Sequence, residues 1–128
     1  MLTSGLSQLG EPAIEYLESP YFGDYALTAR WPDIQIRVIR DKGRESAEVR
    51  PGHEAEDWFD LPLIQTLLTG RDTGGESTIE EQAGFIADHL AEILQAFAQV
   101  AWPLTKHRLE SLERARAEKS LGPLPDRE

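Results

Sequence analysis

The sequence predicts an α+β fold, in which a three-stranded antiparallel meander at about 25–50 packs against an N-terminal helix and three C-terminal helices. Two patterns favour it. Apolar residues alternate with period two over 34–40, as in half-buried strands, and recur every three to four residues over 79–97, as in amphipathic helices. The chain has 128 residues, 40% of them hydrophobic, which suits a single domain. We place that domain at 1–120 and a flexible C-terminal tail at 121–128.

Between Glu11 and Pro20 the sequence predicts a short N-terminal helix. Pro12 suits the first turn of a helix, where the N–H that it lacks would have no partner in any case. Pro20 ends the helix, because the residue before a proline is pushed out of the helical region. The apolar residues between the two prolines supply a packing face for this helix.

Three strands follow, at 25–31, 34–40 and 45–50. Pro32-Asp33 forms the first turn and the segment 41–44, Asp-Lys-Gly-Arg, forms the second. We expect the middle strand to alternate between a buried and an exposed face, because its apolar residues are two positions apart.

The second turn also sets the register of the hairpin. A two-residue loop at Lys42-Gly43 places apolar residues opposite apolar ones and arginines opposite glutamates, each such pair contributing about 0.2–1 kcal/mol. The predicted pairs are Val38 with Ala47, Ile36 with Val49, Arg40 with Glu45 and Arg37 with Glu48. A three-residue loop with a bulge at Gly43 would instead set Ile36 against Glu48, and the turn chemistry accepts both.

The rest of the chain is predicted to be helical. Asp60 is a suitable N-cap for a helix over 61–69, and Gly70 suits the position after its end. A second helix, 79–100, opens with a capping box made by Ser77 with Glu80 or by Thr78 with Glu81. Trp102-Pro103 interrupts it, by a kink or by a break. A last, mostly charged helix runs from Leu104 to about Lys119 and lies on the surface of the domain or projects from it.

Charge is distributed unevenly along the chain, whose formal net charge is −10 at pH 7. Residues 51–100 carry ten acidic side chains and a single basic one, Arg71, a net of −9. A negative field of this kind repels nucleic acid and anionic membrane and favours cationic partners, although solubility alone also explains it. No apolar stretch approaches the roughly 18 residues of a membrane span. We therefore expect neither nucleic acid nor membrane as a partner.

The chain contains no cysteine, which excludes disulfides, thiolate zinc sites and a cysteine nucleophile. Its first 20 residues have neither the basic region nor the continuous apolar run of a signal peptide. We expect a cytoplasmic protein.

The segment 53–60, His-Glu-Ala-Glu-Asp-Trp-Phe-Asp, concentrates the side chains with chemical potential. One interpretation is structural: the last aspartate caps a helix, the two aromatics anchor the loop, and the other carboxylates are solvated. The other is that the same acidic loop is presented to a basic partner. On that interpretation the partner-binding residues are Glu54, Glu56, Asp57, Trp58 and Asp60.

The sequence predicts no metal, cofactor or catalytic residue. His53 and Glu54 begin the zinc-protease pattern HExxH, but Asp57 stands where the second histidine is needed. A calcium loop of the EF-hand type needs a central glycine and a terminal glutamate, which this spacing does not offer. Residues 70–77, GRDTGGES, approach a phosphate-binding loop, but Glu76 replaces the lysine that binds phosphate.

The three histidines, His53, His89 and His107, fall on three different elements. The arginines of the strands have acidic neighbours to pair with and no interleaved aromatic platform, so a nucleic-acid surface is not expected.

The stretch 21–61 resembles a known type of protein. An FG-D turn at 22–24 leads to a strand, then to IRVIRDKGRESAEV at 36–49, then to WFDL at 58–61, which opens a helix. This resembles small bacterial α+β proteins of similar length without an assigned function. In size and acidity the chain is also similar to immunity proteins of bacterial polymorphic toxins. The resemblance covers about a third of the chain and transfers no functional residue.

These observations favour a non-catalytic protein-binding module, of the inhibitor or immunity type, which binds a basic protein such as a toxin through an acidic surface. One alternative is a secretion-type chaperone or adaptor, which would form a homodimer with an exposed apolar groove. Another is a small enzyme that uses His53 or His89 with a carboxylate in a pocket. A last alternative is an interaction module that acts through the charged helix after Pro103. The oligomeric state does not follow from the sequence.

Overall fold

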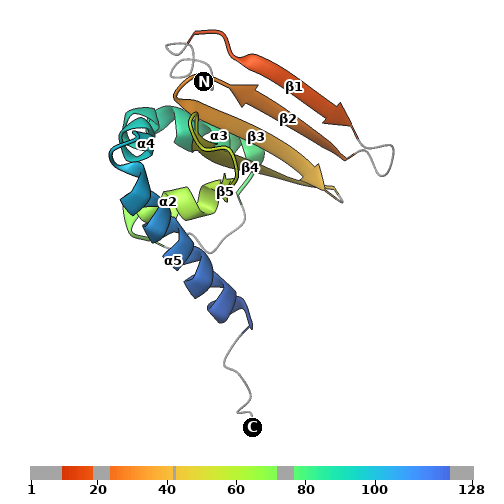
Figure 1. The fold of residues 1–128 in the computed structure, drawn as a ribbon. Helices are drawn as coiled ribbons and strands as arrows, with labels where there is room; N and C mark the ends of the chain where they lie inside the picture. The colour runs from red at the N-terminus through yellow and green to blue at the C-terminus, as the bar shows by residue number, and fades with distance from the viewer. Residues whose placement is uncertain (1–9, 19–23, 42, 72–76, 122–128) are drawn as a thin grey trace.

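The computed structural model describes residues 10–18, 24–41, 43–71 and 77–121, which form a five-stranded antiparallel sheet and four helices (Figure 1). The strands follow one another in the sheet in chain order, from β1 at one edge to β5 at the other. The strands are β1 (Ala13–Glu18), β2 (Tyr25–Arg30), β3 (Ile34–Asp41), β4 (Arg44–Pro51) and β5 (Phe59–Asp60), and the helices are α2 (Leu61–Thr69), α3 (Ile79–Asp88), α4 (Leu90–Phe97) and α5 (Trp102–Leu121).

The predicted N-terminal helix is wrong, because its residues form the edge strand β1. This strand pairs with β2 in an antiparallel register that sets Ile14 opposite Ala29 and Tyr16 opposite Leu27. An apolar run this short has no periodicity that separates strand from helix, and a neighbouring strand that offers backbone partners decides the outcome. With the two residues of β5 at the other edge, the sheet has five strands where three were predicted.

The predicted register of the β3–β4 hairpin is confirmed. All four expected pairs are present, and Asp41 opposite Arg44 closes the turn. Gly43 has a φ of 82°, in the left-handed region that glycine enters without steric cost. Arg37 and Glu48 form an ion pair across the strands, so opposite charges meet as the register required.

The predicted start and end of α2 and the predicted start of α3 are confirmed. The side chain of Asp60 accepts a hydrogen bond from the N–H of Leu63 at 3.1 Å and caps α2, which ends at Gly70 with a φ of 74°. Thr78 and Glu81 form a complete capping box at the start of α3. These contacts satisfy backbone groups that a helix end leaves without an intrahelical partner.

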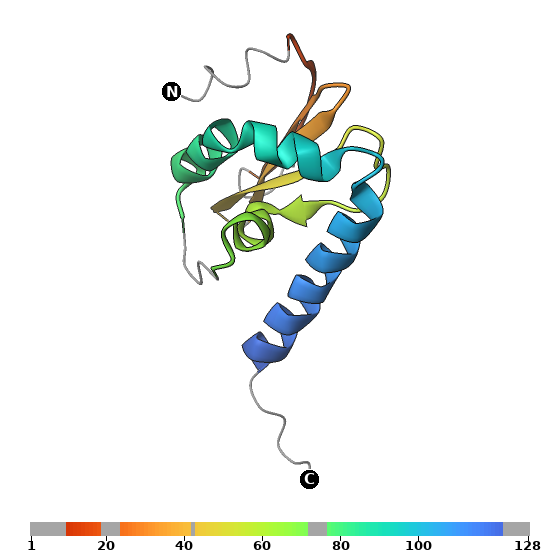
Figure 2. The same cartoon turned by 90° about the vertical axis from the view of Figure 1, so that its left-hand side faces the viewer.

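The long helix expected over 79–100 is instead two helices. His89 leaves the helical region, with φ −117° and ψ 21°, and separates α3 from α4. The last helix begins earlier than predicted, at Trp102, with Pro103 in its first turn. Its first turns reach the core through Trp102 and Leu109. Figures 1 and 2 show its later turns extending beyond the rest of the described fold, which is one of the two predicted arrangements. Of the predicted tail, residues 122–128 lie outside the described residues.

The core lies between one face of β4 and β5 and the helices α2, α3 and α4, which contact the sheet mainly at these strands. Figure 2 shows α3 and α4 running across this face. Three aromatic rings meet at the centre of the helical side, because Trp102 packs edge-on against both Phe59 and Phe97 at centroid distances of 5.9 and 5.4 Å. The fully buried large side chains include Ile34, Val49, Phe59, Leu61, Ile64, Ile86, Ile93, Phe97 and Leu109.

Gly52 and Gly84 give opposite expectations for the same substitution. A Cβ on Gly52 would lie 1.8 Å from the carbonyl oxygen of Pro32, so Gly52→Ala forces two chain segments apart. We expect this variant to lower the free energy of unfolding by about 1–3 kcal/mol. A Cβ on Gly84, inside α3, meets nothing within 4 Å. Gly84→Ala should therefore raise the free energy of unfolding by about 0.5–1 kcal/mol. Urea unfolding followed by circular dichroism measures both, and equal effects would contradict the close approach at Gly52.

Candidate functional site

The loop between β4 and β5 is built around the carboxylate of Glu54, whose side chain is only 9% exposed. One oxygen accepts a hydrogen bond from the indole N–H of Trp102 at 3.0 Å. The other accepts the backbone N–H groups of Asp57 at 3.0 Å and Glu56 at 3.2 Å, and lies 3.4 Å from Nζ of Lys106. Because Trp102 and Lys106 are one helical turn apart, this single side chain fixes the loop to the first turns of α5.

The backbone of Glu54 is fixed as well. Its N–H donates to the carbonyl oxygen of Pro51 at 3.1 Å, and its carbonyl oxygen accepts from Nε2 of Gln35 at 3.3 Å. The same amide of Gln35 also lies 3.2 Å from the carbonyl oxygens of Pro51 and Gly52. The end of β4, the start of β3 and the loop are therefore joined at one buried polar group.

Three carboxylates, of Glu54, Glu56 and Asp57, bring oxygens within 4.8 Å of one another, a spacing that suits a metal ion. In this structure the ammonium group of Lys106 lies against two of them, 3.4 Å from Glu54 and 3.1 Å from Asp57. The cluster therefore has a cation of the chain itself to balance its charge, and its geometry does not require a metal. These two contacts also join Lys106, and with it α5, to the loop.

These contacts shift two pKa values in opposite directions. Burial acts to raise the pKa of Glu54, but hydrogen bonds from Asp57, Trp102 and Glu56, together with the charge of Lys106, outweigh burial and lower it below 4.5. The hydrogen bond to Asp57 is the largest influence on Lys106 and raises its pKa above 10.5, against a smaller opposing effect of burial. Both groups are held in their charged forms at neutral pH.

Asp60 and Trp58 also make contacts within the fold. Besides capping α2, Asp60 forms an ion pair with Arg116 of α5 at 2.8 Å. The guanidinium groups of Arg37 and Arg50 lie 4.3 and 4.1 Å from the centre of the Trp58 ring, within the range of cation–π attraction. Trp58 therefore anchors the loop on the charged face of the sheet, whereas Phe59 anchors it in the core.

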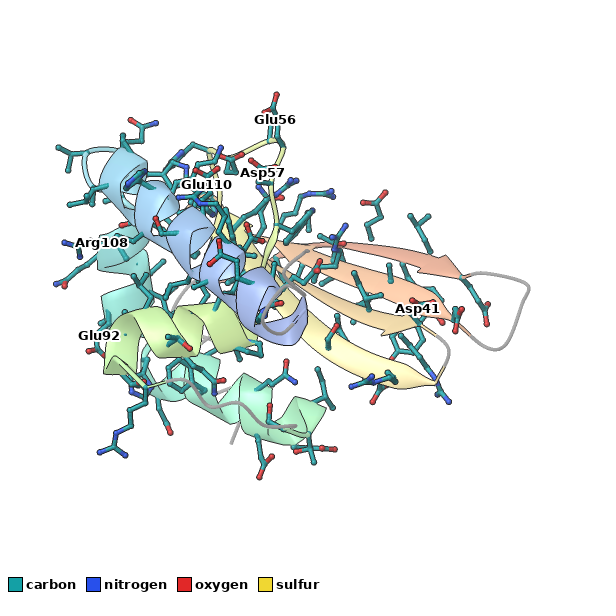
Figure 3. The ribbon with its side chains drawn as sticks, turned by 90° about the horizontal axis from the view of Figure 1, so that it is seen from below. Asp41, Glu56, Asp57, Glu92, Arg108 and Glu110 are labelled. Atoms are coloured by element: carbon teal, nitrogen blue, oxygen red, sulfur yellow. The ribbon has the colours of Figure 1, made fainter. Side chains whose placement is uncertain are left out.

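Four of the five predicted partner-binding residues lie on the loop between β4 and β5, and the fifth, Asp60, is the last residue of β5 next to it. Glu54, Trp58 and Asp60 hold this loop in place through the contacts above. Glu56 is exposed, and the side chain of Asp57 is 51% exposed. Figure 3 shows both on the loop next to α5. Contact of any of the five with a partner stays a prediction.

The three histidines lie on separate elements, as predicted. Nε2 of His53 is 2.8 Å from the carbonyl oxygen of Phe97. His89 stacks on Phe85 at 4.1 Å, with Nδ1 3.2 Å from the carbonyl oxygen of that residue. His107 is exposed on α5. Each of the first two has a backbone partner, which gives it a structural role at a loop or a helix boundary.

An open hollow of about 710 Å³ lies between the β3–β4 hairpin and the start of α3. Its wall is polar and apolar in about equal parts, with charges of both signs from Asp41, Arg44 and Glu80. The buried amide of Gln82 lies beside it and accepts from the N–H of Ala47 at 2.9 Å. This hydrogen bond joins α3 to β4, so the buried Gln82 side chain beside the hollow has a structural role.

The sequence did not indicate a second surface, which is formed by the apolar side chains on the helix-facing side of the sheet. They form two lines across the strands, which we term the apolar rows. The first row is Ile14, Ala29, Ile36, Val49 and Phe59, and the second is Tyr16, Leu27, Val38 and Ala47. Exposure rises along both rows from β5 or β4 toward β1, from 2% at Phe59 to 59% at Ile14, and from 2% at Ala47 to 53% at Tyr16.

The apolar rows are uncovered at β1 and β2 because the helices pack on the other half of the sheet. Figure 1 shows β1 and β2 extending away from the helices. Of the five large hydrophobic side chains that are exposed in the described part of the chain, Ile14, Tyr16 and Leu17 lie on β1. The signal for this surface was the apolar content of 13–17, which we had assigned to the packing face of a helix.

Removing the Glu54 carboxylate should loosen α5. Glu54→Ala leaves the indole N–H of Trp102 without its acceptor, and we expect a loss of about 1–3 kcal/mol in the free energy of unfolding. Glu54→Gln keeps an acceptor for Trp102 but loses the charge that attracts Lys106, so its loss should be smaller. Glu56→Ala is the matched control on the same loop and should stay within about 0.5 kcal/mol of the parent. Urea unfolding ranks the three variants; a Glu56→Ala variant as unstable as Glu54→Ala would contradict this role.

The lowered pKa of Glu54 makes its contribution depend on pH. A carboxyl whose pKa is lower in the folded than in the unfolded chain stabilises the fold above its unfolded pKa, and this effect disappears as the pH falls through the folded pKa. The stability difference between the parent and Glu54→Gln should therefore be constant near neutral pH and shrink as the pH falls below 4.5. Urea titrations at a series of pH values measure it. A difference that does not change on acidification would show that the charge of Glu54 has no part in holding α5.

Among the described residues, no helix combines the length and the apolar character that crossing a membrane requires. Comparisons of the chain with protein-family models, with curated proteins and with solved structures found no match. Function is therefore argued from the two surfaces described above, the acidic loop and the apolar rows.

Proposed function

We propose that the chain is a non-catalytic protein-binding module of the inhibitor or immunity type, and that its partner is a basic protein. The observation that carries the proposal is the exposure of Ile14 and Tyr16 at the open end of the apolar rows. All six residues of β1 are exposed, and none of them belongs to the buried core. Contiguous apolar surface on an edge strand is uncommon in proteins that act alone, and a binding partner is the usual reason for it.

The acidic character of the chain supports a basic partner. Lys106 and Arg116 neutralise part of the 53–60 loop from within, which leaves a smaller set of exposed carboxylates to meet another protein. Among the described residues of 51–100 these are Glu56 and Asp57 on the loop and Glu80, Glu81, Asp88 and Glu92 on α3 and α4. Such charges speed the encounter with a positively charged partner, while the apolar rows supply the area that is buried. The proposal includes a cytoplasmic location, which the absence of cysteine favours.

The apolar rows also favour a second candidate, a chaperone or adaptor of the secretion type. Such a protein would form a homodimer and hold an apolar segment of its client. Sedimentation separates the two candidates: a dimer that Ile14→Lys dissociates favours the adaptor, and a monomer favours the inhibitor.

A pair of lysine substitutions on β1 tests the proposed function. Ile14 and Leu17 have nearly the same exposure, 59% and 61%, but lie on opposite faces of the sheet. The parent, used as bait in a lysate of its source organism, should capture one basic protein at low salt and less of it at high salt. Ile14→Lys places a charge at the end of an apolar row and should abolish capture, whereas Leu17→Lys should retain it. Mass spectrometry identifies the captured protein.

The matched pair makes the outcome specific to one face. Both variants add the same charge to the same strand, so a general effect on solubility or net charge would change them equally. Equal capture by the parent and Ile14→Lys would exclude the apolar rows as the binding surface. Capture that does not change with salt would contradict the basic nature of the partner.

A further inference from the structure

We propose that the partner binds by adding an extended strand to the free edge of β1, and that this strand carries apolar and basic side chains in a defined order. The inference rests on the proposed function and specifies which kind of segment the partner contributes. It follows from the backbone at the edge of the sheet, from the side chains of β1 and from the charge of the chain.

The two edges of the sheet differ in how open they are. At one edge, β5 has only two residues and runs directly into α2, which leaves little backbone for another strand. At the other edge, β1 has six residues, and no strand of the described chain pairs with its outer side. Natural proteins protect a long edge with proline, charged side chains (above all lysine) or a bulge. The two glutamates of β1 are charges of this kind, but they repel an acidic strand and attract a basic one. The β1 sequence, Ala-Ile-Glu-Tyr-Leu-Glu, has neither proline nor lysine, and its pairing with β2 is continuous.

The side chains of β1 define what an added strand would carry. Residues directly opposite each other in an antiparallel pair lie on the same face of the sheet. Pairs of apolar side chains are favourable there, and so are pairs of side chains with opposite charge. The positions opposite Ile14 and Tyr16 would continue the apolar rows, and the position opposite Leu17 would be apolar on the other face. The positions opposite Glu15 and Glu18 would be basic. In the direction of the partner chain, the order is basic, apolar, apolar, basic, apolar.

Charge favours a different protein over a second copy of this chain. A second copy would join two chains that each carry a net charge of −10. Pairing of two β1 strands would also place four glutamates along one strand pair. Within the described fold, Glu15 has a cation beside it, Arg30 at 2.9 Å, but its side chain is still 49% exposed. A basic segment removes this repulsion and gains attraction at the same positions.

The test uses a synthetic peptide, acetyl-Thr-Lys-Val-Val-Lys-Val-Thr-amide, with the intact protein labelled for NMR. We expect the backbone amide signals of residues 13–18 to shift on titration. Ile14→Lys should weaken binding by about tenfold, and Leu17→Ala by less, because Leu17 has no row of buried residues to extend. The same peptide with glutamate in place of both lysines should not bind.

Backbone methylation distinguishes strand addition from simple apolar contact. In an added strand, alternate N–H groups point toward β1 and the others point to solvent. Two peptides, methylated on one or the other alternate set of nitrogens, have the same composition and nearly the same side-chain surface. Binding should be lost for one of them and kept for the other. Equal binding of both would overturn pairing along the edge, and shifts confined to α3, α4 or the 53–60 loop would overturn the location.

The outcomes separate this inference from the function on which it rests. If the peptide fails to bind while capture of the natural partner still depends on Ile14, strand addition is wrong and the proposed function stands. If capture of the natural partner is the same for the parent and Ile14→Lys, the proposed function itself is wrong. A peptide-free dimer that Ile14→Lys dissociates would show that a second copy occupies the edge, and would also overturn the inference.

Discussion

The carboxylate of Glu54 is the contact on which the arrangement of sheet and helices depends. It receives hydrogen bonds from Trp102 and Lys106 of α5, while its own backbone is bound to Gln35 and Pro51 at the ends of two strands. A buried carboxylate without partners would be costly, but four donors around this one offset the cost of its burial. Because Trp102 also packs on the aromatic centre of the core, the polar contact and the apolar core position α5 together.

This arrangement changes what the net charge of the middle third means. The excess of −9 over 51–100 suggested an acidic surface, but Lys106 and Arg116 reach back from the last helix and neutralise part of it. Charge in a sequence window is a sum over residues, whereas a surface depends on which charges the fold pairs. In the proposed function, the acidic residues that stay exposed would attract a basic partner at long range, and attraction of this kind sets the rate of encounter more than the affinity. Affinity requires buried area, which the apolar rows offer.

Sequence patterns predicted the parts of the fold that depend on local chemistry. The hairpin register followed from a turn at 42–43 and four cross-strand pairs, and the cap at Asp60 from one side chain next to a helix start. The role of Glu54 could not be predicted, because its partners Trp102 and Lys106 are 48 and 52 residues away along the chain. The strand β1 was missed because its six residues fit both periods, and only pairing with β2 decides between them. Because these residues were predicted to form a helix, the exposed end of the apolar rows was not predicted either.

Exposure is graded along the apolar rows, and this gradient supports the proposed binding surface more than the exposure of single residues does. Near β4 and β5 their residues are buried by helices, so apolar side chains there stabilise the chain itself. At β1 no helix covers them, and a polar strand former such as threonine would pair with β2 equally well. Tyr16 gains a stacking contact with Tyr25, at 5.9 Å, but Ile14 faces only Ala29 across the strands. The 59% of Ile14 that stays exposed is therefore removed from water only when something beyond the described chain covers it. A strand added at β1 would do so while satisfying the backbone of the edge.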